Sequence, residues 1–377
     1  MTDIKSIKDT GFLGSRKTIG MIRFMKAIDT PKVESKTDKT NKSKVTNTTD
    51  YGFYKAVEIK DGDKVFLARA ITWAESSNVT YKAKAIKLLE RCSTNKSISL
   101  RIAVTGSPGV GKSTLIEALG ISLIQKGFKV AVLAVDPSST ESHGSILGDK
   151  TRMSELSQQI NAYVRPSPTG LELGGVNSST RESILLCEAA GFNIIFIETV
   201  GVGQSEVEVK GMSDLFLLLL NPGGGDDLQG IKKGIIELAD IIAVTKYDGN
   251  LKTSSQNAFS FIKQSAQVLK HSSKNFEPRI INISAIENYH IDELESIIFE
   301  VEKAYKSTGH FERNRNEQNT SWFELGLQKQ LFEAIRREES VQSIISNFRK
   351  KPLEANVFIP LEIEEALKEI KIKLQLK

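Results

Sequence analysis

The stretch Leu100-Arg-Ile-Ala-Val-Thr-Gly-Ser-Pro-Gly-Val-Gly-Lys-Ser-Thr114 decides the fold of this chain. Its first six residues form a mostly apolar run of the kind found in buried strands. Two glycines with four residues between them follow, and Lys112 and Ser113 come directly after the second glycine. This is the pattern of a phosphate-binding loop that connects a strand to a helix. The stretch therefore predicts an α/β domain that binds a nucleotide.

The residue types of this loop suit the negative charge of a triphosphate. Glycines let the backbone amides curl round phosphate oxygens, and the N-terminus of the following helix adds partial positive charge. Lys112 would reach the β- and γ-phosphates, and the Ser113 hydroxyl would ligate Mg²⁺. The nucleotide-binding residues predicted in this loop are Gly106, Ser107, Pro108, Gly109, Val110, Gly111, Lys112, Ser113 and Thr114.

Other apolar runs in the centre of the chain are short and uninterrupted. Runs of this kind indicate strands that are covered on both faces, as in a mostly parallel sheet. We predict strands at residues 100–105, 129–135, 193–197, 215–220, 241–244 and 279–283. The fold class is therefore α/β, with a doubly wound, mostly parallel sheet that carries the phosphate-binding loop.

Helical segments flank this central domain. Apolar residues at three- and four-residue spacing between 63 and 92 predict a helical hairpin with a break at Asn78. After Thr308-Gly309 the chain becomes polar and helical, with an amphipathic segment at 322–335 and a short helix at 361–377. We divide the chain into an N-terminal segment 1–50, a helical region 51–98, a P-loop domain 99–306 and a helical extension 307–377. The extension could form a dimer interface or an intramolecular brace.

Residues 1–50 differ in composition from the rest. They hold eleven Lys/Arg and six Asp/Glu, so they account for the whole net charge of +5. The remainder is neutral, and this argues against a basic body for nucleic acid. The segment is either a disordered tail or an organelle targeting sequence, although its acidic residues are unusual for the latter.

The composition excludes several further classes of protein. The densest apolar run, Leu215–Leu220, is far too short to span a membrane. Two cysteines, Cys92 and Cys187, are too few for a disulfide framework or a thiolate metal site, and they are expected to be small buried side chains. The four histidines show no ligand spacing, so we expect no structural metal.

The identity of the nucleotide is predicted by Thr245-Lys-Tyr-Asp248, which follows the strand at 241–244. The Asp248 carboxylate could accept hydrogen bonds from N1–H and the exocyclic amine of guanine, which adenine does not offer in that arrangement. Lys246 would pack on the base plane. The commoner motif begins with Asn where this chain has Thr245. Ser284-Ala285, at the end of the last predicted strand, fits a second guanine-contacting loop.

Acidic residues at other strand ends are candidates for a metal–phosphate site. Glu198, in Glu198-Thr-Val-Gly201, could hold Mg²⁺ directly or through water, with the Gly201 amide facing the γ-phosphate. A structural acid at the end of a strand is the alternative. Asp136 and Asp149 could likewise bind the metal or cap the following turn.

Several central segments carry a resemblance to a known family. They are Val132–Thr140, Gly144–Met153, Arg165–Pro168, Glu198–Gln204 and Asp227–Gly234. From about residue 67 to the C-terminal helices, the chain resembles the methylmalonyl-CoA mutase-associated GTPases, a group that includes MeaB, ArgK and the methylmalonic aciduria type A proteins. Residues 1–50 lie outside the resemblance.

The resemblance implies a GTP-binding homodimer that hydrolyses GTP to GDP and phosphate. It would gate delivery of adenosylcobalamin to methylmalonyl-CoA mutase, or to a related acyl-CoA mutase, and protect or rescue that enzyme. The cobalamin would be carried by the partner enzyme, with no nucleic acid or membrane involved. Carried over by motif position, the metal ligands and switch acids are Ser113, Asp136, Asp149 and Glu198, and the catalytic candidates are Lys112, Glu198, Gln229 and Lys232.

Gln229 and Lys232 match a third mobile loop of the family, where Lys232 would stabilise the developing phosphoryl charge. The chain departs from the family pattern at His143, at Gly170-Leu-Glu172 and at Asp227, which bears on the switch loops and on partner coupling. Thr245 and the run at 161–166 resemble mitochondrial members. They favour a mitochondrial matrix location over the bacterial cytoplasm.

Two other functions remain compatible with the same fold. A metal-insertion GTPase would need Cys or His ligands near the switches, and the sequence shows no such cluster. A P-loop kinase would need a catalytic base and an acceptor pocket, which the sequence does not reveal.

Overall fold

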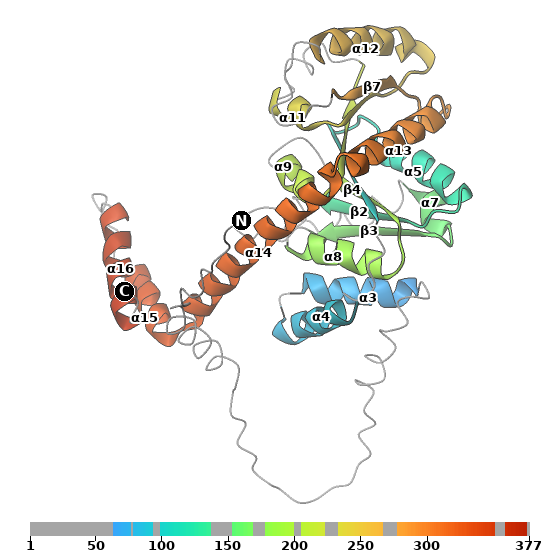
Figure 1. The fold of residues 1–377 in the computed structure, drawn as a ribbon. Coiled ribbons are helices and arrows are strands. Elements are labelled where there is room, and N and C mark those ends of the chain that lie inside the picture. Colours follow the sequence, from blue (N-terminus) through green and yellow to red (C-terminus); the bar gives the residue numbers. More distant parts are fainter. Residues whose placement is uncertain are drawn as a thin grey trace, which may run out of the picture. The chain divides into compact units, whose positions relative to one another are not determined.

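The computed structural model describes residues 63–76, 78–92, 99–136, 153–168, 178–199, 205–222, 233–266, 277–350 and 359–374. At its centre lies a seven-stranded parallel sheet in the order β3-β2-β4-β1-β5-β6-β7 (Figure 1). The strands are β1 (Leu100–Gly106), β2 (Val130–Asp136), β3 (Ala162–Pro168), β4 (Ile194–Thr199), β5 (Leu215–Leu220), β6 (Ile241–Val244) and β7 (Arg279–Asn282). The predicted α/β fold class is confirmed.

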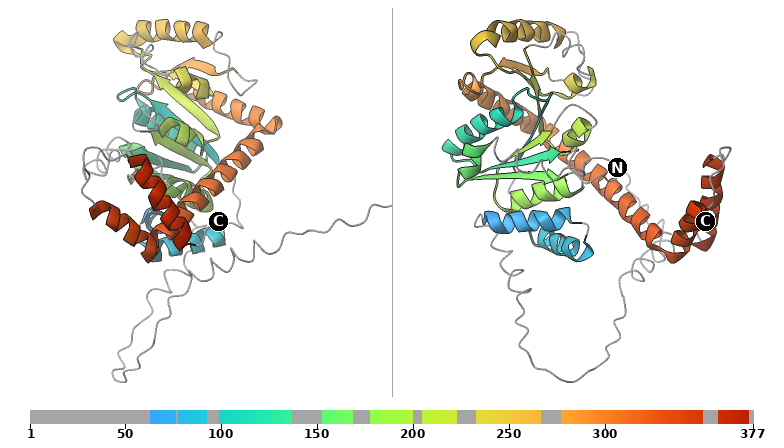
Figure 2. Two further views of the ribbon diagram at one scale, coloured as in Figure 1. Left: turned by 90° about the vertical axis from the view of Figure 1, so that its left-hand side faces the viewer. Right: turned by 180° about the vertical axis from the view of Figure 1, so that it is seen from behind.

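Helices cover both faces of this sheet, as the uninterrupted apolar strands require. One face packs on α3 (Lys64–Glu75), α4 (Val79–Cys92), α8 (Ser178–Ala189), α9 (Ser205–Lys210), α11 (Lys233–Leu238) and α12 (Lys252–Ala266). The opposite face packs on α5 (Lys112–Gln125), α7 (Ser154–Gln158) and α13 (Ile291–Ser307). Figure 2 shows the α3–α4 pair on one side of the sheet and α5 with α13 on the other.

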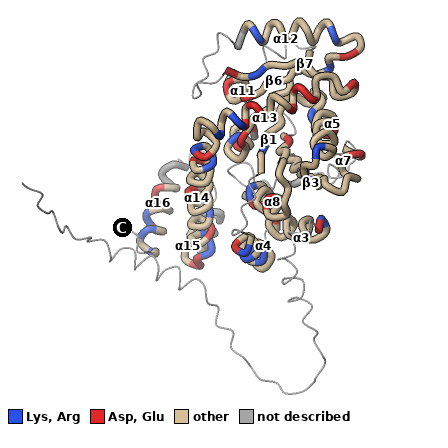
Figure 3. The backbone as a smooth tube through the Cα atoms, turned by 45° about the vertical axis from the view of Figure 1, so that its right-hand side comes forward, with Lys and Arg blue, Asp and Glu red and all other residues tan. Residues whose placement is uncertain are grey.

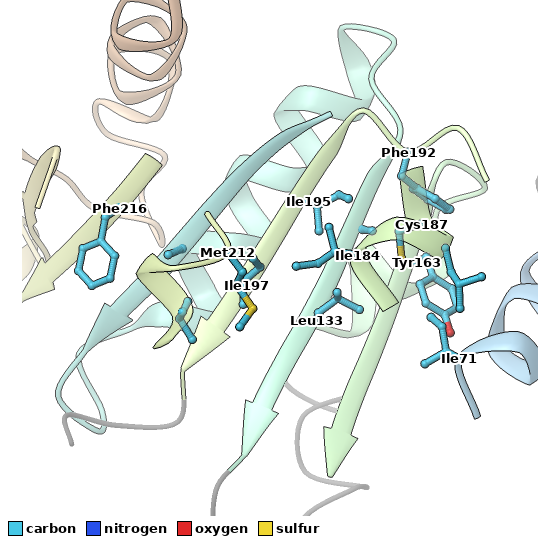
Figure 4. Close-up of a cluster of buried hydrophobic side chains, with 14 of the residues drawn as sticks. Ile71, Leu133, Tyr163, Ile184, Cys187, Phe192, Ile195, Ile197, Met212 and Phe216 are labelled. Atoms are coloured by element: carbon cyan, nitrogen blue, oxygen red, sulfur yellow. The ribbon is translucent and has the colours of Figure 1, made fainter. Parts of the chain in front are cut away.

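Successive residues of a strand point to opposite faces, so each central strand feeds two cores. In β1, Ala103 joins the core beneath α8, whereas Ile102 and Val104 join the core beneath α5. Figure 4 shows the first core, in which Ile195 and Ile197 of β4 lie near Leu133 of β2. Cys187 is fully buried in that core, as predicted, and burial raises the pKa of its thiol.

The predicted helical hairpin is present. Asp63 accepts hydrogen bonds from the amides of Val65 and Phe66 and so caps α3. The predicted break at Asn78 is also found, because its side chain accepts a hydrogen bond from Thr80 N at the start of α4. The hairpin packs against α8.

The sequence prediction missed strand β3. Its sequence Ala-Tyr-Val-Arg-Pro-Ser-Pro contains two prolines and an arginine, which break the apolar pattern that marks the other strands. Proline is tolerated at a sheet edge because a ladder hydrogen bond is needed on one side only, and among the described strands β3 pairs with β2 alone. The structure thus adds an edge strand to the six that were predicted.

The C-terminal extension consists of three described helices where two were predicted. They are α14 (His310–Arg337), α15 (Glu339–Lys350) and α16 (Ile359–Lys373). Basic and acidic residues are interspersed along α14 (Figure 3). None of the helices in the described part of the chain is long and apolar enough to cross a membrane.

Candidate nucleotide-binding site

The predicted site residues that the structure describes gather at one edge of the sheet. Because all seven strands run in parallel, their carboxyl ends meet along the same edge, where ligands of open α/β sheets bind. The phosphate loop follows β1, Glu198 lies near the end of β4, Thr245 follows β6 and Ser284 follows β7. The sheet order reverses at β1, which has β4 on one side and β5 on the other, so the phosphate loop lies at the topological switch point.

The phosphate loop requires glycine at three positions. Gly106, Gly109 and Gly111 have φ angles of 151°, 76° and 105°, values that side-chain-bearing residues rarely adopt. A Cβ atom at Gly106 would also lie 2.6 Å from the carbonyl oxygen of Leu219 on the neighbouring strand. Gly111 is the N-cap of α5, so the loop turns directly into the helix N-terminus that was predicted.

Lys112 lies along the inner side of this loop. Its side chain is only 7% exposed, and its Nζ donates to the carbonyl oxygens of Gly106 at 2.8 Å and Ser107 at 3.1 Å. The amide of Val110 donates to the same Ser107 carbonyl. Pro108, Gly109 and Thr114 are exposed. The loop therefore holds the lysine amine within reach of the positions where phosphate oxygens would bind.

Two predicted metal ligands meet across the sheet edge. Ser113 Oγ donates to Glu198 Oε1 at 2.9 Å, although the two residues are 85 positions apart. Glu198 is opposite Val104 in β1 and Ala134 in β2, so it lies between these strands. A hydroxyl and a carboxylate are the hard oxygen ligands that Mg²⁺ prefers. This pair fits the predicted metal site.

The structure describes only part of the remaining predicted acids and switch residues. Asp136 is the last residue of β2, one position beyond the pairing of Val135 with Thr199, but its side chain lies outside the described residues. Other predicted residues also lie outside the described part of the chain, namely Asp149, Gly201, Gln229 and Lys232, together with the departures at His143, Gly170–Glu172 and Asp227. Their roles stay predictions.

Thr245 joins the phosphate loop to the loop at residues 245–248, which is the first of the two base-reading loops; the second contains Ser284 and Ala285. Its hydroxyl donates to the carbonyl oxygen of Val110 at 2.8 Å and lies 3.2 Å from that of Leu220. The threonine that departs from the commoner motif is thus buried and hydrogen-bonded. Ser255 on α12 in turn donates to the Thr245 carbonyl. No local sequence pattern predicts these contacts, because they depend on segments that only the fold brings together.

The two predicted guanine-contacting loops also meet. Ser284 Oγ donates to Asp248 Oδ2 at 2.5 Å and accepts a hydrogen bond from the amide of Glu287. Ala285 is partly buried next to it, and Lys246 has a positive φ of 57° beside Asp248. Asp248 is held through one carboxylate oxygen, and its role as the acid that reads the purine stays a prediction.

Another contact that sequence reasoning missed lies between β1 and β4. Thr199 Oγ1 donates to Thr105 Oγ1 at 2.9 Å, and both side chains are fully buried. This bond connects the residue before the phosphate loop to the residue after Glu198. It adds to the backbone pairing that holds β1, which carries the phosphate loop, beside β4, which carries Glu198.

Fold and site together define a P-loop protein that binds a guanine nucleotide, and comparison with known proteins agrees. The family model of the methylmalonyl Co-A mutase-associated GTPase MeaB matches residues 67–340. The GTPase ArgK of Escherichia coli is 43% identical over 277 residues, covering 74% of this chain and 82% of ArgK. The mitochondrial methylmalonic aciduria type A homolog of Mus musculus is 41% identical over 302 residues, covering 78% of this chain and 73% of the mouse protein.

A solved structure shows the same architecture. The crystal structure of a LAO/AO transport system kinase aligns with a TM-score of 0.65 at 30% identity, covering 88% of this chain and all of that one. The chain belongs to the MeaB family of methylmalonyl-CoA mutase-associated GTPases. It is accordingly an enzyme that hydrolyses GTP to GDP and phosphate.

The geometry accounts for how these residues would serve hydrolysis. The loop amides and Lys112 are placed to neutralise charge on the β- and γ-phosphates. Ser113 and Glu198 would hold Mg²⁺, which when bound supplies further positive charge to the phosphate oxygens. Asp248 and Ser284 would select the base. Catalysis of this kind is mostly positioning and electrostatic stabilisation, which a fixed loop provides.

Proposed function

We propose that this GTPase is a chaperone of methylmalonyl-CoA mutase or of a related cobalamin-dependent acyl-CoA mutase. In this proposal GTP hydrolysis gates delivery of adenosylcobalamin to the mutase and protects or reactivates it. The single observation that carries the proposal is the extent of the family match, which runs from α3 into α15. It therefore includes helices that lie outside the sheet and its nucleotide site.

These added helices are firmly built onto the GTPase. The α3–α4 pair packs on α8, and Arg165 of β3 forms an ion pair with Glu75 of α3. The first half of α14 is hydrogen-bonded, through Asn314 and Arg315, to the residues that precede β5 and β1. Helices fixed in this way could transmit a change at the nucleotide site to a bound protein.

We further propose that the chain forms a homodimer through its C-terminal helices. The support is a set of large apolar side chains exposed on α14, among them Phe323 at 68% and Phe332 at 66% exposure. Exposed apolar groups of this size on one helix are typical of protein interfaces. Light scattering on the purified chain would give the oligomeric state. A monomer at micromolar concentration would contradict the proposal.

The client can be identified by affinity capture. Tagged protein would be incubated with extract containing the mutase in the presence of GDP, of a non-hydrolysable GTP analogue, or of neither. We expect the mutase to be retained in a nucleotide-dependent manner. Absence of any cobalamin-dependent mutase under all three conditions would defeat the chaperone proposal and leave the GTPase assignment intact.

Lys232 provides a sharper test of coupling to the client. Lys232→Ala should abolish the stimulation of GTP turnover by the mutase. If the lysine stabilises transition-state charge, the stimulated rate should fall by more than about tenfold. GTP affinity should be unchanged. The matched control is Lys233→Ala, which removes the same charge one position along the chain. Equal stimulation of the Lys232→Ala variant and the unaltered protein would contradict the role.

The structural relative described as a transport system kinase favours one alternative, transfer of the γ-phosphoryl group to an acceptor. Hydrolysis of γ-labelled GTP separates the two functions. A chaperone GTPase would release labelled inorganic phosphate, whereas a kinase would leave label on a protein or small-molecule acceptor. Metal insertion is the other alternative, and it would be supported by stoichiometric binding of nickel in dialysis.

We also propose a mitochondrial matrix location if the chain is eukaryotic. The mouse relative is named as mitochondrial, and residues 1–50 carry the basic excess. Fractionation of cells expressing the full chain would test the proposal. Recovery in the cytosol would contradict it.

A further inference from the structure

The two base-reading loops have unusual backbone conformations. Every non-glycine residue with positive φ in the described part of the chain lies in these loops: Lys246 at 57°, Asn288 at 52° and His290 at 59°. Such conformations are uncommon for residues with side chains. They persist where surrounding contacts over-determine the backbone, and they cluster at ligand sites. The loops must therefore be held by something besides their own preferences.

A group of mutually tilted aromatic rings, referred to below as the stack, joins the two loops. The ring of Tyr247, from the loop after β6, lies 5.1 Å from the ring of Tyr289, from the loop after β7. The Tyr289 ring lies 3.8 Å from that of His290. Lys252, at the start of α12, places its Nζ 5.2 Å from the centroid of Tyr247 and 5.9 Å from that of Tyr289. A cation at this distance from an aromatic face is attracted to it.

Backbone bonds place this stack in register with the base-reading acid. The Tyr247 amide donates to the carbonyl oxygen of Ile283, and Ser284 and Tyr289 exchange both hydrogen bonds of an antiparallel bridge. Tyr247 immediately precedes Asp248, which is bonded to Ser284. Each of the two loops that form the Ser284–Asp248 contact thus carries one of the tyrosines.

We propose that Tyr247 and Tyr289 are positioning residues for guanine recognition. Their stack, with Lys252 over it, holds the two loops together so that the Asp248 carboxylate faces the edge of the base. The tyrosines do not themselves need to contact the nucleotide. The inference rests on binding of a guanine nucleotide and is independent of any partner enzyme.

A merely structural role and a positioning role give different results when several nucleotides are compared. The phosphate loop is common to GTP and ATP binding, whereas Asp248 can favour guanine only if it is correctly aimed. Loss of the stack should therefore weaken GTP more than ATP. General damage to the fold would weaken both nucleotides equally.

The test is calorimetric titration of Tyr289→Ala with GTP, ITP and ATP in the presence of Mg²⁺. We expect GTP affinity to fall about tenfold, the loss that corresponds to one aromatic pair contact. ATP affinity should stay the same, so the preference for GTP narrows by the same factor. ITP, which lacks the exocyclic amine, should lose less than GTP. Tyr289→Phe keeps the ring and should restore GTP affinity to within about twofold.

The matched control is Tyr81→Ala. Tyr81 lies on α4 and is 45% exposed, against 37% for Tyr289, and it also has a lysine over its ring, Lys84 at 5.5 Å. This variant should bind all three nucleotides as the unaltered protein does. If Tyr289→Ala does not fold, Tyr247→Leu and Lys252→Met serve as further variants, with the same expected narrowing. An unchanged ratio of GTP to ATP affinity in the folded variants would overturn the inference, whether or not a mutase binds.

Discussion

The two ends of the parallel sheet are built in opposite ways. At the carboxyl ends of the strands lie the phosphate loop, the switch acid and the base-reading loops, with positive φ angles at Gly109, Gly111 and Lys246. At the amino ends, α14 is tied down by Arg315, which donates to both oxygens of Asp214 at 2.7 Å and to the carbonyl of Ser99 at 2.7 Å. One end is arranged for a ligand, and the other is closed by ion pairs within the chain.

Further contacts complete the closure of the amino ends. Arg101 makes two hydrogen bonds to Glu188 of α8 at 2.9 and 3.0 Å. Asp240 accepts hydrogen bonds from Tyr305 at 2.5 Å, from the Phe216 amide at 2.7 Å and from Lys210 at 2.9 Å. Burial, and to a lesser extent the charge of the nearby Asp240, raises the pKa of the Tyr305 hydroxyl, so the tyrosine remains a hydrogen-bond donor. The same charged residue types therefore support stability at one end and chemistry at the other.

This difference predicts that substitutions at the two ends affect different properties. Lys112→Ala should have the largest effect and should act on activity alone. Removing the phosphate-loop amine should lower the rate of GTP hydrolysis by roughly 10³-fold, about 4 kcal/mol of transition-state stabilisation. The free energy of unfolding should change little. Phosphate release under single-turnover conditions gives the rate, and urea denaturation gives the stability.

The control is an exposed lysine at the C-terminal end of the same helix, α5. Lys126→Ala removes an amine that pairs with Asp292 and Glu295 far from the loop. It should leave hydrolysis unchanged. A Lys112→Ala protein with a normal hydrolysis rate would show that the carboxyl end of the sheet is not the site of chemistry.

Asp214→Ala tests the opposite end. Asp214 is 2% exposed, and its loss leaves the partly buried Arg315 guanidinium with weaker compensation from Glu188 at 3.4 Å. Removing the buried carboxylate of this ion pair should lower the free energy of unfolding by about 3 kcal/mol. GTP affinity should be retained in the folded fraction. The control is Asp292→Ala, because the carboxylate of Asp292 is largely exposed. Urea denaturation gives the free energy of unfolding of both variants.

The exposed control should lose less than about 1 kcal/mol. If both variants were equally stable, the network at the amino ends would not hold α14 in place. The contrast between the two ends of the sheet would then have no energetic basis.

Glu182 extends the comparison, because it is a partly buried acid that belongs to neither end of the sheet. Its Oε2 has no hydrogen-bond partner among the described residues, and burial raises the pKa of its carboxyl to about 7, partly offset by Lys82 and Lys329. The unfolded chain ionises this group near 4.5, so between about pH 4.5 and 7 the folded state binds more protons. The free energy of unfolding should therefore fall as pH rises through this range.

Glu182→Gln should remove that pH dependence and leave the protein more stable above pH 7, by about 2 kcal/mol. Urea denaturation at intervals from pH 5 to pH 8 would measure the slope for both proteins. Parallel curves would mean that the Glu182 carboxyl does not titrate in this range. GTP hydrolysis at pH 8 should be the same in both.

Much of this protein could be predicted from local patterns in its sequence. The phosphate loop, the hairpin break at Asn78 and the strand at 241–244 depend on the residues within each segment, and the structure has them where they were predicted. The order of the polar motifs along the chain also placed Lys112, Glu198 and Asp248 at strand ends. Parallel strands then bring those ends to one edge.

Other features depended on which segments meet, and no local pattern records that. Strand β3 is stable at the edge despite Pro166 and Pro168 because β2 pairs with it on one side. The Arg315–Asp214 pair joins residues 101 positions apart. Thr245 stands where the commoner guanine-binding motif has Asn, yet its hydroxyl joins the base-reading loop to the phosphate loop. Periodicity and motif spacing reflect the conformation of neighbouring residues, whereas these bonds form only after the sheet has assembled.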